Sequence, residues 1–338
     1  MRVNLHSDTQ TRPTGAMRAA MAAAEVGDEQ RGQDPTTAEL ERRVAALLGH
    51  EAAVFLPSGT MCNELALRLH IRPGGDELIV DRTAHPIVAE AGGPAALSGA
   101  MIAPLDGDGG IFTAGQLREV LHVDGDRYAA RSRLVSVEQT TNMGGGRIWP
   151  RERIEQVLAV VRDHGLRAHL DGARLMNASV ASGVAPAEYA RGFDTAWIDF
   201  SKGLGAPVGA VLAGSQALIE EAWRYKQMMG GALRQSGILA AGCLYALDHH
   251  VERLAEDHAN ARALADGLAV IPGVTIDPGA VETNIVIFEV RDAPALERAL
   301  APEVDLLAIG PTRVRAVTHL DVDRAQIDGA LRAIAAAL

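Results

Sequence analysis

Two ionisable residues, Asp171 and Lys202, follow apolar segments that have the composition of buried strands. Asp171 closes "LRAHLD", and Lys202 follows "TAWIDFS". A lysine whose amine has lost its proton forms a Schiff base with an aldehyde. A carboxylate beside the ring nitrogen of pyridoxal phosphate keeps that ring protonated and electron-withdrawing. The two residues together are typical of a site for pyridoxal 5'-phosphate.

A third segment, "PSGTMCN", offers groups that bind a phosphate. Ser58, Gly59 and Thr60 are small or carry hydroxyls, and they precede a predicted helix whose first N–H groups attract anions. The segment is weak evidence on its own. It becomes stronger evidence because Asp171 and Lys202 follow it in this order.

Further polar residues follow other predicted strands, namely His85, Glu138 to Asn142, and Arg174. Each residue also has an ordinary structural reading: Asp171 as a helix cap, Lys202 as a solvated loop residue, His85 as a packed core residue. In open α/β sheets, however, ligands bind beyond the carboxyl ends of the strands. The accumulation of such residues at successive strand ends therefore favours a functional site.

A mostly parallel sheet would bring these strand ends together. Apolar segments predict seven strands, within 51–60, 76–85, 100–106, 133–141, 166–173, 195–203 and 209–215. Helical patterns lie between several of them, for example at 61–70 and 151–165. Strands that alternate with helices indicate an α/β sheet covered on both faces.

The C-terminal part of the chain has a different pattern. It is predicted to contain a long helix with one break, two strands and two further helices, at 232–271, 283–290 and 313–320, and 293–301 and 323–338. This pattern indicates a smaller α+β unit. We therefore divide the chain into an N-terminal arm, a large α/β domain and a small C-terminal α+β domain, at 1–15, 16–245 and 246–338.

Seven motifs, in order along nearly the whole chain, resemble those of one family. They are "SDTQTRPT", "MAAAEVGDE", "PSGTMCNELAL", "HLDGARLMNA", "SKGLGAPVGAVLAG", "GGALRQSGILAA" and "ETNIVIF". The set is similar to the threonine aldolase family, the β-eliminating-lyase branch of fold-type I pyridoxal-phosphate enzymes. The resemblance implies a transferase-like fold with a mostly parallel seven-stranded sheet, in which the large domain binds the cofactor. It also implies a homo-oligomer, a dimer or tetramer, with shared active sites.

The resemblance assigns roles in catalysis and cofactor binding. Lys202 would form the Schiff base with pyridoxal 5'-phosphate, Asp171 would face the pyridine nitrogen, and His85 would stack on the ring near the substrate hydroxyl. The phosphate would be held by Ser58, Gly59 and Thr60, with Arg234 contributed by another subunit.

The resemblance also assigns substrate contacts. Ser7, Arg174 and Arg315 would bind the α-carboxylate, and Arg174 would lie near the cofactor as well. Arginine suits this task because its guanidinium donates two parallel hydrogen bonds. Arg313, two residues from Arg315 on the same strand face, is the alternative.

Two positions depart from the family pattern near the distal end of the substrate. Arg31 in "QRGQDP" stands where the family has a tyrosine, and Thr141 in "EQTTN" stands where it has a histidine. An arginine that points inward would favour a substrate with an acidic side chain, such as 3-hydroxyaspartate. The alternative is that Arg31 points outward and pairs with a nearby acid, Asp28, Glu29 or Asp34. The smaller Thr141 would leave room for a bulkier aldehyde.

The expected activity is retro-aldol cleavage of a threonine-like β-hydroxy-α-amino acid into glycine and an aldehyde. His85, directly or through a water, is the expected base. One alternative is a β-elimination or dehydratase reaction on a β-hydroxy amino acid such as 3-hydroxyaspartate. Another is a non-catalytic descendant of the fold that serves as a binding module.

The composition of the chain limits the classes of partner and the cellular compartment that we expect for it. The formal net charge is −11, and no basic stripe favours nucleic acid. No uninterrupted apolar run reaches membrane length, and the polar start "MRVNLHSDTQTRP" has no signal-peptide core. Cys62 and Cys243 lie in apolar helical patterns, which indicates reduced thiols and a cytoplasmic protein. We expect a small-molecule amino acid substrate and no metal site.

Overall fold

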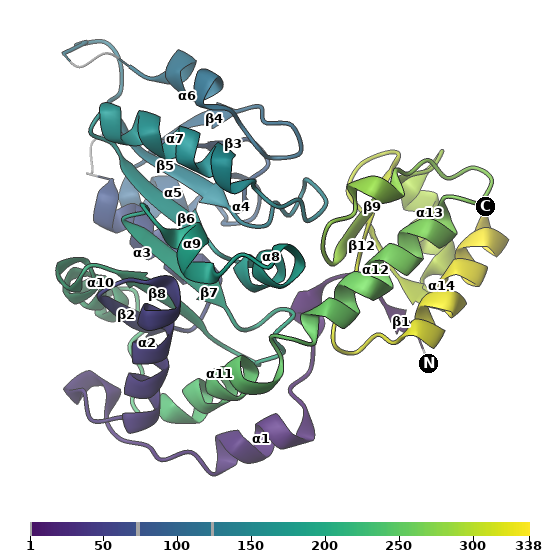
Figure 1. The fold of residues 1–338 in the computed structure, drawn as a ribbon, viewed down its shortest axis with the longest axis horizontal. Coiled ribbons are helices and arrows are strands. Elements are labelled where there is room, and N and C mark those ends of the chain that lie inside the picture. Colours follow the sequence, from purple (N-terminus) through teal and green to yellow (C-terminus); the bar gives the residue numbers. More distant parts are fainter. Residues whose placement is uncertain (1, 72–74, 123–124) are drawn as a thin grey trace.

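Seven strands form one sheet in the computed structural model, which describes residues 2–71, 75–122 and 125–338. Their order is β2-β8-β7-β6-β5-β3-β4. The strands are β2 (Ala52–Leu56), β3 (Glu77–Asp81), β4 (Met101–Leu105), β5 (Ser132–Glu138), β6 (Arg167–Asp171), β7 (Thr195–Asp199) and β8 (Ala210–Gly214). β8 runs antiparallel to both neighbours, and the other adjacent pairs are parallel. The predicted seven-stranded, mostly parallel α/β sheet is therefore confirmed (Figure 1).

Side chains of the apolar strands alternate between two cores. In β2, Val54 and Leu56 lie in one core and Phe55 lies in the other, because successive residues of a strand point to opposite faces. The first core is shared with α3 (Gly59–His70) and α10 (Gln216–Met228). The second is shared with α2 (Pro35–Leu48), α7 (Arg151–Asp163), α8 (Leu175–Ser182), α9 (Pro186–Ala190) and α11 (Gly237–His249). Because helices cover both faces of the sheet, these strands are apolar along their whole length.

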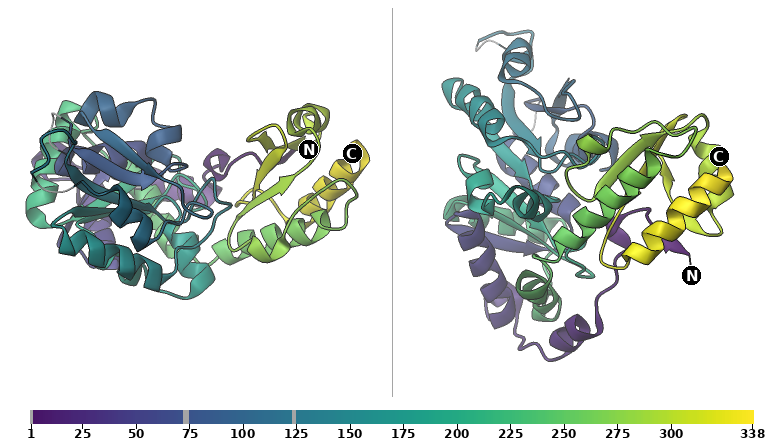
Figure 2. Two further views of the ribbon diagram at one scale, coloured as in Figure 1. Left: turned by 90° about the horizontal axis from the view of Figure 1, so that it is seen from above. Right: turned by 45° about the vertical axis from the view of Figure 1, so that its right-hand side comes forward.

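The C-terminal part forms a smaller lobe with its own core (Figures 1 and 2). Its antiparallel sheet has the order β11-β12-β9. The elements are α12 (Leu254–Leu268), β9 (Ile285–Glu289), α13 (Ala293–Leu300), β11 (Leu307–Ala308), β12 (Arg313–Val317) and α14 (Arg324–Ala337). The first strand, β1 (Val3–Asn4), pairs in parallel with β10 (Val304–Asp305), so the start of the chain joins this lobe. The domain boundaries at residues 15 and 245 stay a prediction.

The long helix predicted over 232–271 consists of two helices, α11 and α12. α11 begins at Gly237 because the preceding backbone is engaged elsewhere. The Leu233 N–H donates to Glu29 Oε2 at 2.7 Å, and the Glu29 N–H donates to the Arg234 carbonyl at 2.8 Å. The segment before α11 is thereby tied to the loop that precedes α2. α1 (Gly15–Ala22) also packs against α11.

Strand register brings several strand ends to one edge of the sheet. Leu56 at the end of β2 pairs with Ala210, which pairs in turn with Asp199 at the end of β7. Glu138 at the end of β5 pairs with Asp171 at the end of β6. The segments that follow these strands therefore begin side by side.

Two further observations concern the chain as a whole. Within the described ranges, no helix combines the length and apolar character needed to span a membrane. Cys62 and Cys243 are buried free thiols.

Candidate active site

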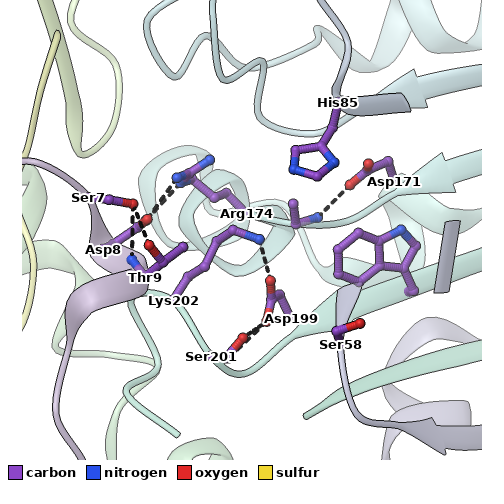
Figure 3. A network of polar contacts seen from close by, with 12 residues as sticks. Ser7, Asp8, Thr9, Ser58, His85, Asp171, Arg174, Asp199, Ser201 and Lys202 are labelled. Atoms are coloured by element: carbon purple, nitrogen blue, oxygen red, sulfur yellow. Dashed lines mark hydrogen bonds and ion pairs between the residues drawn. The ribbon is translucent and has the colours of Figure 1, made fainter. Parts of the chain in front are cut away.

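Lys202 lies just after β7, and its amine is paired with a carboxylate (Figure 3). The Nζ atom forms an ion pair with Asp199 Oδ2 and lies 5.7 Å from the centre of the Trp197 ring. Asp199 Oδ1 accepts hydrogen bonds from the N and Oγ atoms of Ser201, each at 2.8 Å. The Thr11 hydroxyl donates to the Lys202 carbonyl at 2.9 Å. Side chain and backbone of the lysine are thus both held in place.

Asp171 ends β6 and is buried with two neutral donors. Its Oδ2 accepts from Asn63 Nδ2 at 2.8 Å, and its Oδ1 accepts from the Ala173 N–H at 3.0 Å. Asn63 is itself fixed, because its Oδ1 accepts from Trp197 Nε1 at 2.9 Å. Burial raises the pKa of Asp171, and the Asn63 hydrogen bond opposes this effect. Within the described ranges Asp171 forms no ion pair, so none of these residues places a cation in contact with the carboxylate.

His85 begins α4 (His85–Val88), and a buried carboxylate orients its ring. His85 Nδ1 lies 2.8 Å from Glu90 Oε1, which also accepts from Asn63 Nδ2 at 2.8 Å. A carboxylate oxygen only accepts hydrogen bonds, so the proton lies on Nδ1. In the neutral ring Nε2 is then a free acceptor. The His85 side chain is 32% exposed, whereas that of Glu90 is fully buried.

The start of α3 leaves N–H groups available for an anion. Ser58 caps the helix, with its Oγ accepting from the Met61 N–H at 3.2 Å. The N–H groups of Gly59 and Thr60 precede the first intrahelical acceptor, as at any helix start. A Cβ at Gly59 would lie 2.3 Å from the Trp197 ring, so this position needs glycine. Ser58 and Thr60 are exposed at the same edge.

Arg174 follows β6, and an acid from the N-terminal segment neutralises it. Its Nε and Nη2 donate to the two carboxylate oxygens of Asp8 at 2.8 and 2.7 Å. Asn284 Nδ2 also donates to Asp8, at 3.0 Å. Burial acts to raise the pKa of Asp8, but the contacts with Arg174 outweigh it and hold that pKa well below its ordinary value. The pair leaves no net charge.

Arg315 lies on β12 of the C-terminal lobe and supplies an uncompensated positive charge. Its Nη1 donates to Asn142 Oδ1 at 2.8 Å, and its Nη2 donates to the His6 carbonyl at 3.3 Å. The buried Nε has no acceptor within the described residues. Arg313, the alternative considered from the sequence, is exposed and donates to the Met143 carbonyl at 3.4 Å. The geometry favours Arg315 over Arg313 as an anion-binding residue.

Six of the predicted site residues surround one region. Figure 3 shows them together: Ser7, Ser58, His85, Asp171, Arg174 and Lys202. Ser7 is buried, and its Oγ accepts from the Thr9 N–H at 3.2 Å and from Thr9 Oγ1 at 2.8 Å.

Arg31 and Arg234, two further predicted site residues, are both exposed. Arg31 is exposed in the loop before α2, and its guanidinium forms no ion pair with any described residue. The nearby acids are engaged otherwise: Asp28 pairs with Arg234 at 3.2 Å, Glu29 pairs with Lys226, and Asp34 caps α2. The outward pairing expected for Arg31 is therefore absent from the described residues.

Thr141 is buried close to glycine backbones. A Cβ at Gly110 would lie 2.9 Å from Thr141 Cγ2, and one at Gly144 would lie 2.4 Å from Thr141 Oγ1. The Thr141 Oγ1 atom has no hydrogen-bond partner within the described residues. A larger side chain at 141 would need these loops to move.

The residues fit pyridoxal phosphate. A ring-nitrogen cation would supply the missing partner of Asp171, and the start of α3 would take the phosphate. Lys202 is the side-chain amine at this edge of the sheet. It is one of two lysines in the sequence, and the other, Lys226, is fully buried against Glu29.

Four residues that build the site are not identified by the sequence patterns. They are Asp8, Asn63, Glu90 and Asp199. Asp199 carried the clearest signal, because it ends a strand three residues before Lys202. Asn63 bonds to Asp171 across 108 residues and Asp8 bonds to Arg174 across 166 residues, and no local pattern shows such pairs.

The chain is similar to known proteins along most of its length. A family model described as "Beta-eliminating lyase" matches residues 4–293. The chain is 41% identical over 328 residues to the low specificity L-threonine aldolase of Escherichia coli (strain K12), covering 96% of each chain. It is 38% identical over 333 residues to low-specificity L-threonine aldolase 1 of Arabidopsis thaliana, covering 96% of this chain and 93% of that one. The solved structure of Leishmania major threonine aldolase has a TM-score of 0.84 at 21% identity, with 98% of both chains covered.

Proposed function

Because this chain belongs to the β-eliminating lyase family, we propose that it is a pyridoxal-phosphate-dependent aldehyde-lyase. It cleaves a β-hydroxy-α-amino acid, threonine or a close analogue, into glycine and an aldehyde. The observation that carries the proposal is the convergence of Lys202, Asp171 and His85 at one edge of the sheet. The names of the relatives support the choice of substrate class.

The cofactor site would use groups from three segments. Lys202 would hold the cofactor aldehyde, Asp171 would pair with the ring nitrogen, and the start of α3 would bind the phosphate. When bound, pyridoxal phosphate supplies an electron sink for the electron pair released by Cα–Cβ cleavage. Asp199 Oδ2 holds the Lys202 ammonium whenever that amine is free.

The substrate is oriented by charge. Arg174 is neutralised by Asp8, so Arg315 provides the net positive charge that binds the α-carboxylate, and Ser7 lies nearby. His85 then accepts the β-hydroxyl proton at Nε2, because Glu90 keeps the other ring nitrogen protonated. Once the hydroxyl has lost that proton, its oxygen forms the carbonyl of the aldehyde product as the Cα–Cβ bond breaks.

Replacing Arg315 by leucine should weaken substrate binding and leave cofactor binding intact. Hydrogen bonds to charged groups contribute roughly 1.5–3 kcal/mol each, so KM should rise about 100-fold. The exposed Arg313→Leu is the matched control on the same strand face, with KM expected within about twofold of wild type. Equal effects of the two substitutions on KM would contradict the assignment.

Arg31 gives a reason to consider a second substrate. Its guanidinium stays protonated and has no ionic partner among the described residues. We propose that in an oligomer it reaches a neighbouring active site and favours 3-hydroxyaspartate. Arg31→Tyr should then lower kcat/KM for 3-hydroxyaspartate roughly tenfold or more relative to threonine. Arg18→Tyr, an exposed arginine on α1, is the control, and an unchanged substrate ratio in Arg31→Tyr would refute the idea.

We propose a homodimer or homotetramer in which Arg31 and Arg234, both exposed, complete a partner's site, with Arg234 at the phosphate. Thr141 would lie near the substrate side chain. We also propose a cytoplasmic location, in accord with the two free thiols. Light scattering coupled to gel filtration measures the molar mass of the particle and so tests the number of subunits.

Product analysis tests the reaction itself. The purified protein, supplied with pyridoxal phosphate, is incubated with threonine, allo-threonine and 3-hydroxyaspartate. Glycine and an aldehyde in equal amounts support the aldolase. Ammonia and a keto acid in their place would identify the β-elimination alternative.

A further inference from the structure

Two buried glutamates meet beside the His85 ring. Glu64 lies on α3 and Glu90 follows α4, and the two carboxyl groups are within hydrogen-bond contact. As whole residues, Glu64 and Glu90 are 3% and 5% exposed. Both Glu64 oxygens and Glu90 Oε2 lack a donor from any other described residue. Gly93 gives the Glu64 carboxyl its space, because a Cβ there would lie 1.9 Å from Oε1.

This contact requires a proton. An ionised carboxylate has acceptors only, so two ionised groups would face each other without a donor in a buried site. A single proton on Glu64 supplies that donor and leaves one negative charge on the pair. Burial, reinforced by the contact with Glu90, raises the pKa of Glu64 to about 8.

The other groups around α3 do not supply a competing partner. α5 (Gly93–Ser98), β2 and β8 carry no ionisable side chain. The remaining elements packed on α3 bring these buried ionisable side chains: Glu138 of β5, His169 and Asp171 of β6, Asp199 of β7 and Lys226 of α10. His169 is neutral because burial lowers its pKa to about 3. Lys226 is engaged by Glu29, and Lys202 pairs with Asp199.

We propose that Glu64 is a positioning residue that acts on His85 through Glu90. As a neutral acid, Glu64 donates to Glu90 and leaves it the single carboxylate that holds the His85 Nδ1 proton. His85 Nε2 then stays free to accept a proton from the substrate. This role rests on the proposed function, in which His85 is the base.

Loss of the Glu64 donor has a defined consequence. Glu90 Oε2 would be left without a hydrogen bond, and the Glu90 carboxylate would become more basic. A more basic partner stabilises the protonated, positively charged His85 ring. The ring would then lose its extra proton, and become an acceptor, only at a higher pH.

The shared proton is measurable without turnover. Infrared spectra of the cofactor-free protein at pH 6 should contain the carbonyl absorption of un-ionised, buried carboxylic acids, and Glu64→Gln should lose one component of it. Since the pKa of Glu64 rises from 4.5 to about 8 on folding, its protonated form favours the fold. This contribution is complete below pH 4.5 and is lost as the pH approaches 8. The melting temperature of wild type should therefore fall relative to that of Glu64→Gln over this interval. A spectrum in which Glu64→Gln keeps the whole band would overturn the shared proton.

The positioning role is tested by the pH profile of kcat/KM. Glu64→Gln keeps a neutral donor, so its acidic limb should coincide with that of wild type. Glu64→Leu should move the limb to higher pH by about one unit, and Glu64→Ala replaces it where the leucine variant does not fold. Glu41→Gln is the matched control, because burial raises the pKa of Glu41 to about 7 while its partner is the Phe55 N–H.

The outcomes separate the two hypotheses. An unmoved acidic limb in both apolar variants would mean that Glu64 only fills space, and the positioning role would be wrong. A limb that moves equally in Glu41→Gln would contradict it as well, since the effect would be general. A wild-type protein without lyase activity would refute the proposed function alone, because the infrared and melting results do not depend on catalysis.

Discussion

Lys202→Ala is expected to lose turnover while the protein keeps its fold. Removing the reacting group of a covalent mechanism costs roughly 10³-fold or more in kcat. No other side-chain amine can substitute, because the second lysine, Lys226, is fully buried and paired with Glu29. Borohydride reduction followed by peptide mass spectrometry should label Lys202 in wild type and no lysine in the variant. A reducible lysine–cofactor adduct in Lys202→Ala would defeat the assignment.

The alanine variant also leaves Asp199 buried without its cation, so a charge control is needed. Lys202→Arg keeps a positive group near Asp199 and has no amine that reacts with an aldehyde. It should be as inactive as Lys202→Ala, with a melting temperature closer to wild type. Recovery of activity in the arginine variant would show that charge, and not amine chemistry, is what the site needs.

Asp171→Asn is expected to retain part of the cofactor and to lose most of the turnover. A neutral amide no longer holds the ring nitrogen protonated, so the electron sink is weakened. Loss of one stabilising group of this kind costs about 3–4 kcal/mol, or roughly 10²- to 10³-fold in kcat. Absorption spectra of the bound cofactor and kcat for threonine measure the two effects separately.

Asp81→Asn is the matched control for Asp171→Asn. Asp81 also ends a strand of the large sheet and is buried, but it accepts from the N–H groups of Thr83 and Gly107 at 2.9 and 2.8 Å. Its amide variant should lose stability and keep most activity. Near-normal turnover in Asp171→Asn would mean that another residue faces the ring nitrogen.

The sequence predicts the architecture well because the sheet leaves strong local signals. Apolar strands buried on both faces, separated by helical periods, predict the seven strands and their parallel arrangement. α10 has no individual prediction, although its apolar positions Ile219 and Ala222 are buried. β1, β10 and β11 have two residues each and are too short to show alternation.

The site is only partly predictable. Asp171, Lys202 and His85 all follow predicted strands, and the first two also stand in family motifs, so their types and order predict a shared site. The residues that hold them do so across the chain: Asn63 reaches Asp171, and Asp8 reaches Arg174. The acids near Arg31 in the sequence also have partners that local sequence does not reveal. Asp28 is taken by Arg234, about 200 residues further along the chain, and such a competitor cannot be identified from local sequence.

The pairing of β1 with β10 bears on how the protein is made. Val3 pairs with Val304, so the first strand has no partner until residue 304 has left the ribosome. Contacts between such distant residues form late in folding. Asp8 follows this strand, and it reaches both Arg174 of the large sheet and Asn284 of the C-terminal lobe. A nascent chain that has completed its large sheet therefore still lacks the contacts that join Asp8 to Asn284, and with them the proposed α-carboxylate site.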